Sequence, residues 1–263
     1  MLPRGPPGRP ATMHGLAPPP RGFDLGLPPF ELEGGQRLPR LHLRGWAWGP
    51  ASDGPVLDTV ARPAPLGDRP VPAAPRSPSV VTAPSRLDPS VPTVLLVHAL
   101  TGDARAGGPG GWWGPLIGPG RPLDPTRSRL LCFNNLGSCY GSFGPSYPDW
   151  PWVPGPQPRF GLGPPELPAA VTTWDQARAI LRALDRLGIQ RVRVATGGSL
   201  GAMIVLALGA LAPERFEQLL PLAGSLAASP WIIGFNHVAR QTILLDPDWP
   251  RGPERGLALA RQL

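Results

Sequence analysis

The distribution of apolar residues along the chain predicts alternating strands and helices in its C-terminal two thirds. Short, continuous apolar runs, as found in strands buried on both faces, occupy residues 93–97 and 129–133, and two further strands are expected at 191–196 and 216–223. Apolar residues recur with helical spacing at 173–187, and residues 200–211 are expected to form an apolar helix. Because strands that alternate with helices imply βαβ crossovers, we expect an α/β fold with a mainly parallel sheet.

The helix expected from residue 173 has recognisable ends. Thr173 and Gln176 have the spacing of a capping box, and Gly188 is a typical C-terminal stop. Its apolar residues share one face, which we expect to be buried: Trp174, Ala177, Ile180, Leu181, Leu184 and Leu187. Two further helical pieces are expected around 231–245 and 253–263.

Proline separates the front of the chain from its back. Residues 1–92 hold 21 of the 41 prolines. We expect residues 1–29, which are rich in proline, glycine and arginine, to be disordered. Within residues 30–48, alternating apolar and polar positions on either side of Gly34 and Gly35 predict a β-hairpin.

Two long loops interrupt the expected core. Residues 49–92 have no usable periodicity, so we interpret them as a Pro-rich insertion between the hairpin and the first core strand. A second loop rich in proline and glycine is expected over 141–168. The core domain is then expected to span residues 30–228.

Charge and cysteine usage narrow the classes of function. The 25 basic residues, all arginine, exceed the 18 acidic ones and give a net charge of +7, but they form no basic run, so we expect no nucleic-acid partner. Cys132 and Cys139 are too few for a zinc site or a disulfide framework and are expected to be small core thiols.

Targeting signals are not apparent in the sequence. No apolar stretch approaches 18 residues, and the N-terminus lacks the apolar segment of a signal peptide. We therefore expect no membrane partner and a cytoplasmic location.

The sharpest chemical feature is Gly197-Gly-Ser-Leu-Gly201, which fits the pattern G-x-S-x-G between a predicted strand and a predicted helix. That context is the nucleophile elbow of the α/β-hydrolase fold. Flanking glycines relieve crowding in a turn where Ser199 is strained and its hydroxyl is lifted to a helix N-terminus. Ser199 is thus the candidate nucleophile; a plain glycine-rich turn or a phosphate loop is the alternative.

A second feature, His98-Ala-Leu-Thr-Gly-Asp103, follows the first buried strand. Enzymes of this fold take one oxyanion-hole N–H from such a loop and the other from the residue after the nucleophile. Leu100 and Leu200 are the candidates for these two backbone donors. We interpret His98 as a strand-end residue that shapes the loop, because in this fold the catalytic base follows the serine in the chain.

These two motifs belong to a set of blocks that resembles the homoserine O-acetyltransferases. The other blocks are Gly111-Trp-Trp-Gly114, Leu116-Ile-Gly-Pro-Gly120, Asn135-Leu-Gly-Ser-Cys-Tyr-Gly-Ser-Phe-Gly-Pro145 and Phe235-Asn-His-Val-Ala-Arg-Gln-Thr-Ile243. The resemblance implies transfer of an acetyl group from acetyl-CoA to the hydroxyl of L-homoserine through an acyl-Ser199 intermediate, a step toward methionine. It also implies that residues 229–263 begin a helical lid.

The resemblance implies two small-molecule substrates and no metal or bound organic cofactor, with acetyl-CoA acting as a co-substrate. It leaves a homodimer open. O-succinyl transfer to homoserine or serine would use the same motifs, and a hydrolase would let water deacylate Ser199. An inactive fragment without a catalytic role is the non-enzymatic alternative.

The resemblance places the catalytic Asp and His beyond the point where this chain stops. Among the residues present, Glu214 and Glu217 precede His237 in the required order, but both follow a helix of about twelve residues that carries them roughly 18 Å from Ser199. His237 falls in the expected lid helix. We therefore expect the fold to be C-terminally incomplete and the 263-residue chain to lack full acyltransferase activity.

Overall fold

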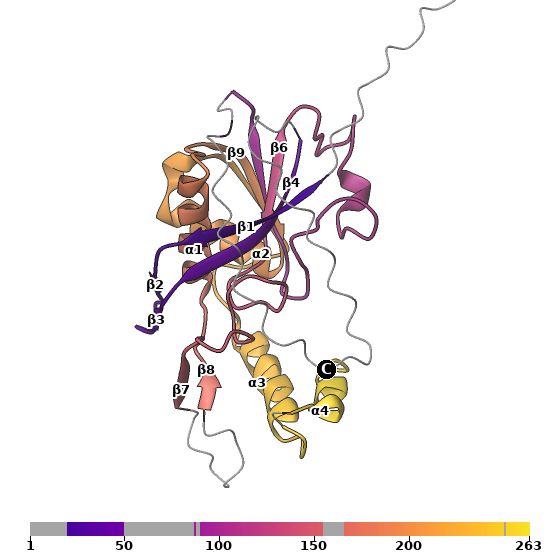
Figure 1. The fold of residues 1–263 in the computed structure, drawn as a ribbon. Coiled ribbons are helices and arrows are strands. Elements are labelled where there is room, and N and C mark those ends of the chain that lie inside the picture. Colours follow the sequence, from indigo (N-terminus) through magenta and orange to yellow (C-terminus); the bar gives the residue numbers. More distant parts are fainter. Residues whose placement is uncertain (1–19, 50–86, 88–89, 155–165, 250) are drawn as a thin grey trace, which may run out of the picture.

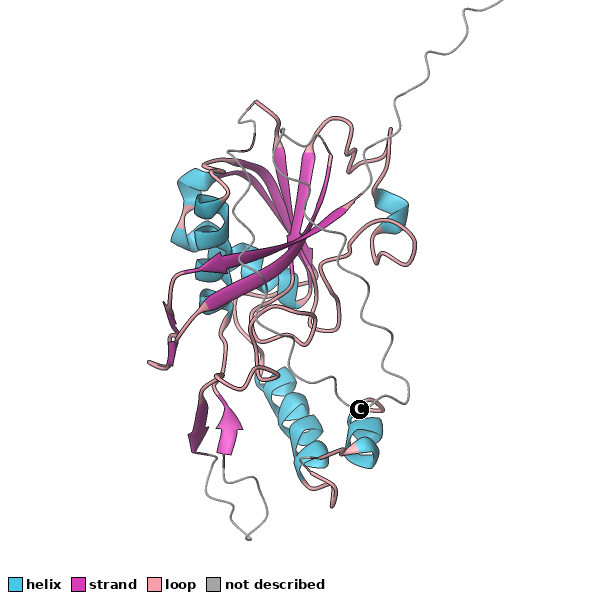
Figure 2. Cartoon of the chain, in the orientation of Figure 1, coloured by secondary structure: helices cyan, strands magenta, loops and turns pink. Residues whose placement is uncertain are grey.

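The computed structural model describes residues 20–49, 87, 90–154, 166–249 and 251–263 (Figure 1). The expectations for residues 1–19 and for most of the insertion 49–92 lie outside these ranges. A six-stranded sheet has the order β1-β4-β6-β5-β9-β10, and helices lie beside it (Figure 2). Its strands are β1 (Arg21–Leu27), β4 (Leu41–Trp48), β5 (Thr93–Val97), β6 (Arg129–Phe133), β9 (Val192–Gly198) and β10 (Phe216–Leu222).

Four neighbouring strands, β6, β5, β9 and β10, run parallel, which confirms the expected α/β fold. Every residue of β5 and β6 is buried, as their continuous apolar runs predicted. In the register, Val97 lies opposite Gly197, and Leu222 lies opposite Gly198. The loops that follow β5, β9 and β10 therefore leave the sheet at one edge.

The prediction of disorder for residues 1–29 is wrong for residues 21–27, which form β1. This strand pairs antiparallel with β4, from Arg21 opposite Ala47 to Leu27 opposite Leu41. Its alternate residues Phe23, Leu25 and Leu27 are buried. Burial of this face stabilises the strand despite the glycine-rich composition.

The predicted hairpin is present in a shorter form. β2 (Phe30–Glu31) pairs antiparallel with β3 (Arg37–Leu38), and Gly35 closes the turn with φ 82°. Beyond the hairpin, β4 joins the central sheet between β1 and β6 instead of continuing the pair.

Helix α1 (Thr173–Arg186) begins with a capping box at Thr172 and Asp175, one residue before the predicted pair. Asp175 is fully buried and also accepts the Glu33 N–H at 2.9 Å, so the box ties α1 to the turn between β2 and β3. Gly188, with φ 72°, follows the helix end as predicted. Trp174, expected in the buried face, is 41% exposed, so that part of the prediction is wrong.

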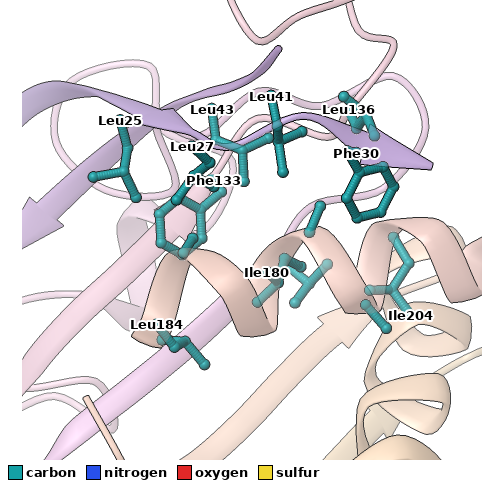
Figure 3. Close-up of a cluster of buried hydrophobic side chains, with 14 of the residues drawn as sticks. Leu25, Leu27, Phe30, Leu41, Leu43, Phe133, Leu136, Ile180, Leu184 and Ile204 are labelled. Carbon is teal, nitrogen blue, oxygen red and sulfur yellow. The ribbon is translucent and has the colours of Figure 1, made fainter. Parts of the chain in front are cut away.

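The main core lies between the sheet and helices α1 and α2 (Leu200–Leu211) (Figure 3). Leu25 and Leu43 from the sheet, together with Phe133, face Ile180 and Leu184 of α1. A second, smaller cluster covers the opposite face and contains Trp48, Val94, Leu96, Leu130 and Cys132 together with residues of the loop after β5. The thiol of Cys132 is buried as expected, but Cys139 is exposed, so that part of the prediction is wrong.

The region 141–168 was expected to be a loop without strands. It contains a small antiparallel pair, β7 (Trp152–Pro154) and β8 (Glu166–Pro168). Two short 3₁₀ helices, η1 (Gly114–Leu116) and η2 (Pro213–Arg215), lie in other connections.

The two C-terminal helices, α3 (Pro230–Leu244) and α4 (Glu254–Ala260), lie close to the predicted positions. They pack on each other away from the sheet (Figure 1). The carboxylate of Asp246 accepts the Gly256 N–H at 2.6 Å and holds the start of α4. In the part of the chain that the structure describes, no helix is long and apolar enough to span a membrane.

A partly buried cluster of Asp24, His42 and Arg44 joins β1 to β4. Asp24 accepts hydrogen bonds from both Nε and Nη2 of Arg44, each at 2.8 Å, and lies 3.0 Å from Nε2 of His42. Burial alone would raise the pKa of Asp24, but the hydrogen bonds from His42 and Arg44 outweigh it and lower the pKa from 3.8 to about 2.

Asp24→Asn is expected to lower the free energy of unfolding by about 2 to 3 kcal/mol at neutral pH, because the ordinary pKa exceeds the folded value by nearly two units. Because the pKa of Asp24 is lower in the folded protein than in the unfolded chain, its carboxylate stabilises the fold above about pH 4. This stabilisation is lost as the pH falls toward 2. Urea unfolding of both proteins between pH 2 and 7 measures the difference.

Asp149→Asn is the matched control, since the Asp149–Arg40 pair is exposed and is expected to contribute less than about 1 kcal/mol. Equal losses in the two variants at neutral pH, or a loss in Asp24→Asn that persists at pH 2, would contradict the assignment.

Candidate functional site

Ser199 lies at a sharp turn between β9 and α2, and it is exposed. Its backbone has φ 54° and ψ −118°, a conformation that non-glycine residues rarely adopt. Its N–H donates to the carbonyl oxygen of Leu222 at 3.0 Å, which anchors the turn to the end of β10. The strained strand–helix turn predicted from G-x-S-x-G is thus present.

The glycines on either side of Ser199 allow the end of β5 to approach this turn. A Cβ atom on Gly197 would lie 2.5 Å from the Val97 carbonyl oxygen, and one on Gly201 would lie 2.2 Å from the same oxygen. Gly198 has open space around the position of its missing Cβ. Two of the three glycines in the motif are therefore required by close backbone packing against β5.

Backbone N–H groups are available beside Ser199. Leu200 is the first residue of α2, where N–H groups have no partner within a helix. Leu100 lies in the loop that follows β5, at the sheet edge where the Ser199 turn also emerges. Within the described residues, neither the Leu100 nor the Leu200 N–H donates a hydrogen bond. Both are free to bind an anionic oxygen.

His98 is almost fully buried at the start of the same loop, with 1% of its surface exposed. Its Nδ1 lies 2.7 Å from the carbonyl oxygen of Ala99, and its Nε2 accepts the Asn135 N–H at 3.1 Å. Burial lowers the pKa of His98 below its ordinary value, more than its hydrogen bond to Ala99 and the charge of Asp103 raise it. The prediction of a strand-end histidine that shapes the loop is confirmed.

Two polar side chains that support this region, those of Asn134 and Gln176, were missed in the sequence. The Oδ1 atom of Asn134 accepts the Ala104 N–H, and the Asn134 amide donates to the Tyr140 carbonyl. Gln176 of α1 makes two hydrogen bonds with the backbone of Leu136, each 2.8 Å long. An Asn-Asn pair directly after a buried strand is the signal that could have indicated Asn134 and Asn135.

The tryptophans near the loop after β5 have a packing role. Trp112 and Trp113 lie with their ring centroids 4.8 Å apart against the smaller core cluster. The indole N–H of Trp112 donates to the Asp103 carbonyl oxygen at 2.8 Å. Arg105 forms an ion pair with the Asp103 carboxylate at 2.8 Å, so both the backbone carbonyl and the side chain of Asp103 are held in place.

The acidic residues after Ser199 lie elsewhere. Glu217 pairs with Arg191 at the start of β9, the opposite end of the strand from Ser199, and Glu214 lies in η2 beside it. His237 is exposed on α3. In the described ranges no side chain forms a hydrogen bond with the Ser199 hydroxyl, and no cluster of three or more His, Cys, Asp or Glu residues could hold a metal ion.

Comparison with known families agrees with this geometry. Residues 92–260 match the family described as alpha/beta hydrolase fold. The chain belongs to the α/β-hydrolase fold family. Within it, the chain is similar to the homoserine O-acetyltransferase of Moorella thermoacetica, with 42% identity over 184 residues, and to that of Thermus thermophilus, with 40% identity over 188 residues.

These alignments cover 65% and 64% of this chain but only 47% of each relative, so the chain spans about half the length of the curated relatives it matches. Among solved structures, homoserine O-acetyltransferase from Staphylococcus aureus has a TM-score of 0.64 and 26% identity, covering 93% of this chain and 57% of that one. Esterase E22 has the same TM-score at 18% identity, covering 92% and 60%, and supports the fold alone.

Gly201→Ala is expected to destabilise the protein by about 3 kcal/mol, because its new Cβ would meet the Val97 carbonyl oxygen. Helix propensity alone would predict the opposite sign, a gain of about 1 kcal/mol. Gly198→Ala, with open space at its Cβ, is the matched control and should change stability by less than about 1 kcal/mol.

Urea unfolding of both variants and the wild-type chain provides the comparison. Equal stability of Gly201→Ala and Gly198→Ala would show that β5 does not press against the Ser199 turn.

Proposed function

We propose that this chain carries the nucleophile of an acyltransferase of the homoserine O-acetyltransferase type. In the proposed reaction, an acetyl group moves from acetyl-CoA to the side-chain hydroxyl of L-homoserine. The observation that carries the proposal is the strained Ser199 at a helix N-terminus, with the unpaired N–H groups of Leu100 and Leu200 at the same edge of the sheet. Identities of 37–42% to relatives of that name support the choice of reaction within the fold family.

The chemistry proceeds through two acyl transfers. The Ser199 hydroxyl oxygen attacks the thioester carbonyl as its proton passes to a base, and a tetrahedral intermediate forms. The N–H groups of Leu100 and Leu200 stabilise the oxygen anion. Its collapse breaks the C–S bond, and the proton taken up by the base passes to the sulfur, so that CoA leaves as the thiol. The homoserine hydroxyl then attacks the acetyl ester and gives its proton to the base. The bond between the acetyl group and the Ser199 oxygen breaks, the base returns the proton to this oxygen, and O-acetyl-L-homoserine leaves.

The base is the part of this mechanism that the described residues do not supply. Because no described side chain forms a hydrogen bond with the Ser199 hydroxyl, its oxygen stays a weak nucleophile near neutral pH. Losing one member of a catalytic triad typically reduces kcat by about 10⁴-fold or more. Acylation of Ser199 in the 263-residue chain is therefore expected to be slow, and an activated ester is the suitable probe.

The proposal includes a role in methionine biosynthesis in the cytoplasm, with two small-molecule substrates. It invokes no bound metal or organic cofactor, because CoA enters the reaction as part of the co-substrate acetyl-CoA. The choice of acetyl over succinyl, and of homoserine over serine, rests on the names of the relatives.

Incubation of the 263-residue chain with p-nitrophenyl acetate is expected to add one acetyl group to Ser199, detected by peptide mass spectrometry. Ser199→Ala should abolish this adduct. Ser138→Ala is a matched control that should retain it, because Ser138 lies in the loop after β6 and not in the elbow. L-homoserine is expected to discharge the acetyl group faster than L-serine or water does.

Several outcomes would contradict the proposal. An adduct rate that is the same in Ser199→Ala would remove Ser199 as the nucleophile. Discharge by water as fast as by homoserine would favour a hydrolase. Faster acylation by succinyl-CoA than by acetyl-CoA would favour the succinyltransferase alternative.

A further inference from the structure

The loop after β5 contains one peptide unit, between Ala99 and Leu100, whose carbonyl group has partners and whose N–H group has none within the described part of the chain. The carbonyl group of Ala99 and the N–H of Leu100 belong to the same planar trans peptide, so they point in opposite directions. The Ala99 oxygen receives two hydrogen bonds, from His98 Nδ1 at 2.7 Å and from the Gly102 N–H at 3.0 Å. The Leu100 N–H has no partner among the described residues. Fixing the oxygen therefore fixes the direction of the free N–H.

The ring of His98 is itself held in one orientation. Its Nε2 faces the Asn135 N–H and must accept this hydrogen bond, which comes from the segment after the neighbouring strand β6. The ring proton is thereby assigned to Nδ1, the atom that faces the Ala99 oxygen. Burial lowers the pKa of His98, which keeps the ring neutral near pH 7.

Gly102 allows this arrangement to close. A Cβ atom at residue 102 would lie 3.1 Å from Cβ of His98 and 3.4 Å from both its Nδ1 and the Ala99 oxygen. The loop thus folds tightly over the imidazole, and its own Gly102 N–H completes the pair of donors to Ala99.

We propose that His98 is a positioning residue, whose Nδ1–H holds the Ala99–Leu100 peptide so that the Leu100 N–H faces the oxygen of the group that Ser199 attacks. This inference rests on the proposed function of Ser199 and Leu100. Rotation of the peptide would break both hydrogen bonds to Ala99 and turn the Leu100 N–H away. The two donors also polarise the peptide, which makes the Leu100 N–H a stronger donor.

Two substitutions separate positioning from space filling. In His98→Asn the side-chain amide nitrogen occupies the place of Nδ1 and can still donate to Ala99, whereas the contact to Asn135 is lost. In His98→Gln the amide group reaches the place of Nε2 and can still accept from Asn135, whereas the contact to Ala99 is lost. A histidine that only filled space would make both variants equally defective.

His42→Gln is the control for loss of a buried histidine. His42 is 6% exposed, and its Nε2 contacts Asp24 between β1 and β4, outside the loop after β5. This variant is expected to lose stability and to keep the Ser199 acetylation rate of the wild-type chain.

The acetylation rate of Ser199 by p-nitrophenyl acetate is the first measurement. Removing one oxyanion donor typically costs about 10²–10³-fold, so His98→Gln is expected to react at least about 10-fold more slowly than the wild-type chain. His98→Asn should recover most of that loss. Equal rates for His98→Asn and His98→Gln would overturn the proposal.

The second measurement does not depend on Ser199 chemistry. Hydrogen exchange of the Gly102 amide, followed by NMR, reports whether its bond to the Ala99 oxygen persists. It should be at least about 10-fold faster in His98→Gln than in His98→Asn, and equal exchange would overturn the proposal. If Ser199 in the wild-type chain is not acetylated, the proposed function fails, and the Gly102 exchange still decides whether His98 holds the peptide.

Discussion

The site depends on the contact between the end of β5 and the turn that follows β9. The carbonyl oxygen of Val97 leaves no room for a Cβ at Gly197 or Gly201. This contact fixes how far the Ser199 turn stands from the loop after β5. Packing of backbone against backbone is stiff, because neither partner has a rotatable side chain that could absorb a shift.

The remaining features of the site follow from that contact. The turn is anchored on its other side by the bond from Ser199 N–H to Leu222, so Ser199 is held between β5 and β10. Its strained backbone is maintained by these two anchors, and the exposed hydroxyl lies at the N-terminus of α2. The loop after β5 is then ordered by His98, which links it to the end of β6.

Much of this arrangement could be predicted because it depends on local patterns. Buried parallel strands have continuous apolar runs, and G-x-S-x-G between a strand and a helix has few structural solutions. The N-cap of α1 lies one residue before the predicted position. Thr172 and Thr173 are both suitable cap residues, and Asp175, three residues after Thr172 and bonded to the Glu33 N–H, decides between them. The strand β1 was missed because its stability comes from pairing with β4, a contact between residues about twenty positions apart. The roles of Asn134 and Gln176 are likewise non-local, since their partners lie in other segments.

The central claim is that Ser199, Leu100 and Leu200 form one acyl-transfer site. A crystal structure of the chain after reaction with an alkyl fluorophosphonate tests it most directly, since the phosphonyl oxygen mimics the oxyanion. The expected result is a covalent bond to the Ser199 oxygen, with the phosphonyl oxygen about 2.7–3.1 Å from the backbone nitrogens of both Leu100 and Leu200. A Ser199 adduct whose oxygen points away from these two nitrogens, or an adduct on another residue, would contradict the claim.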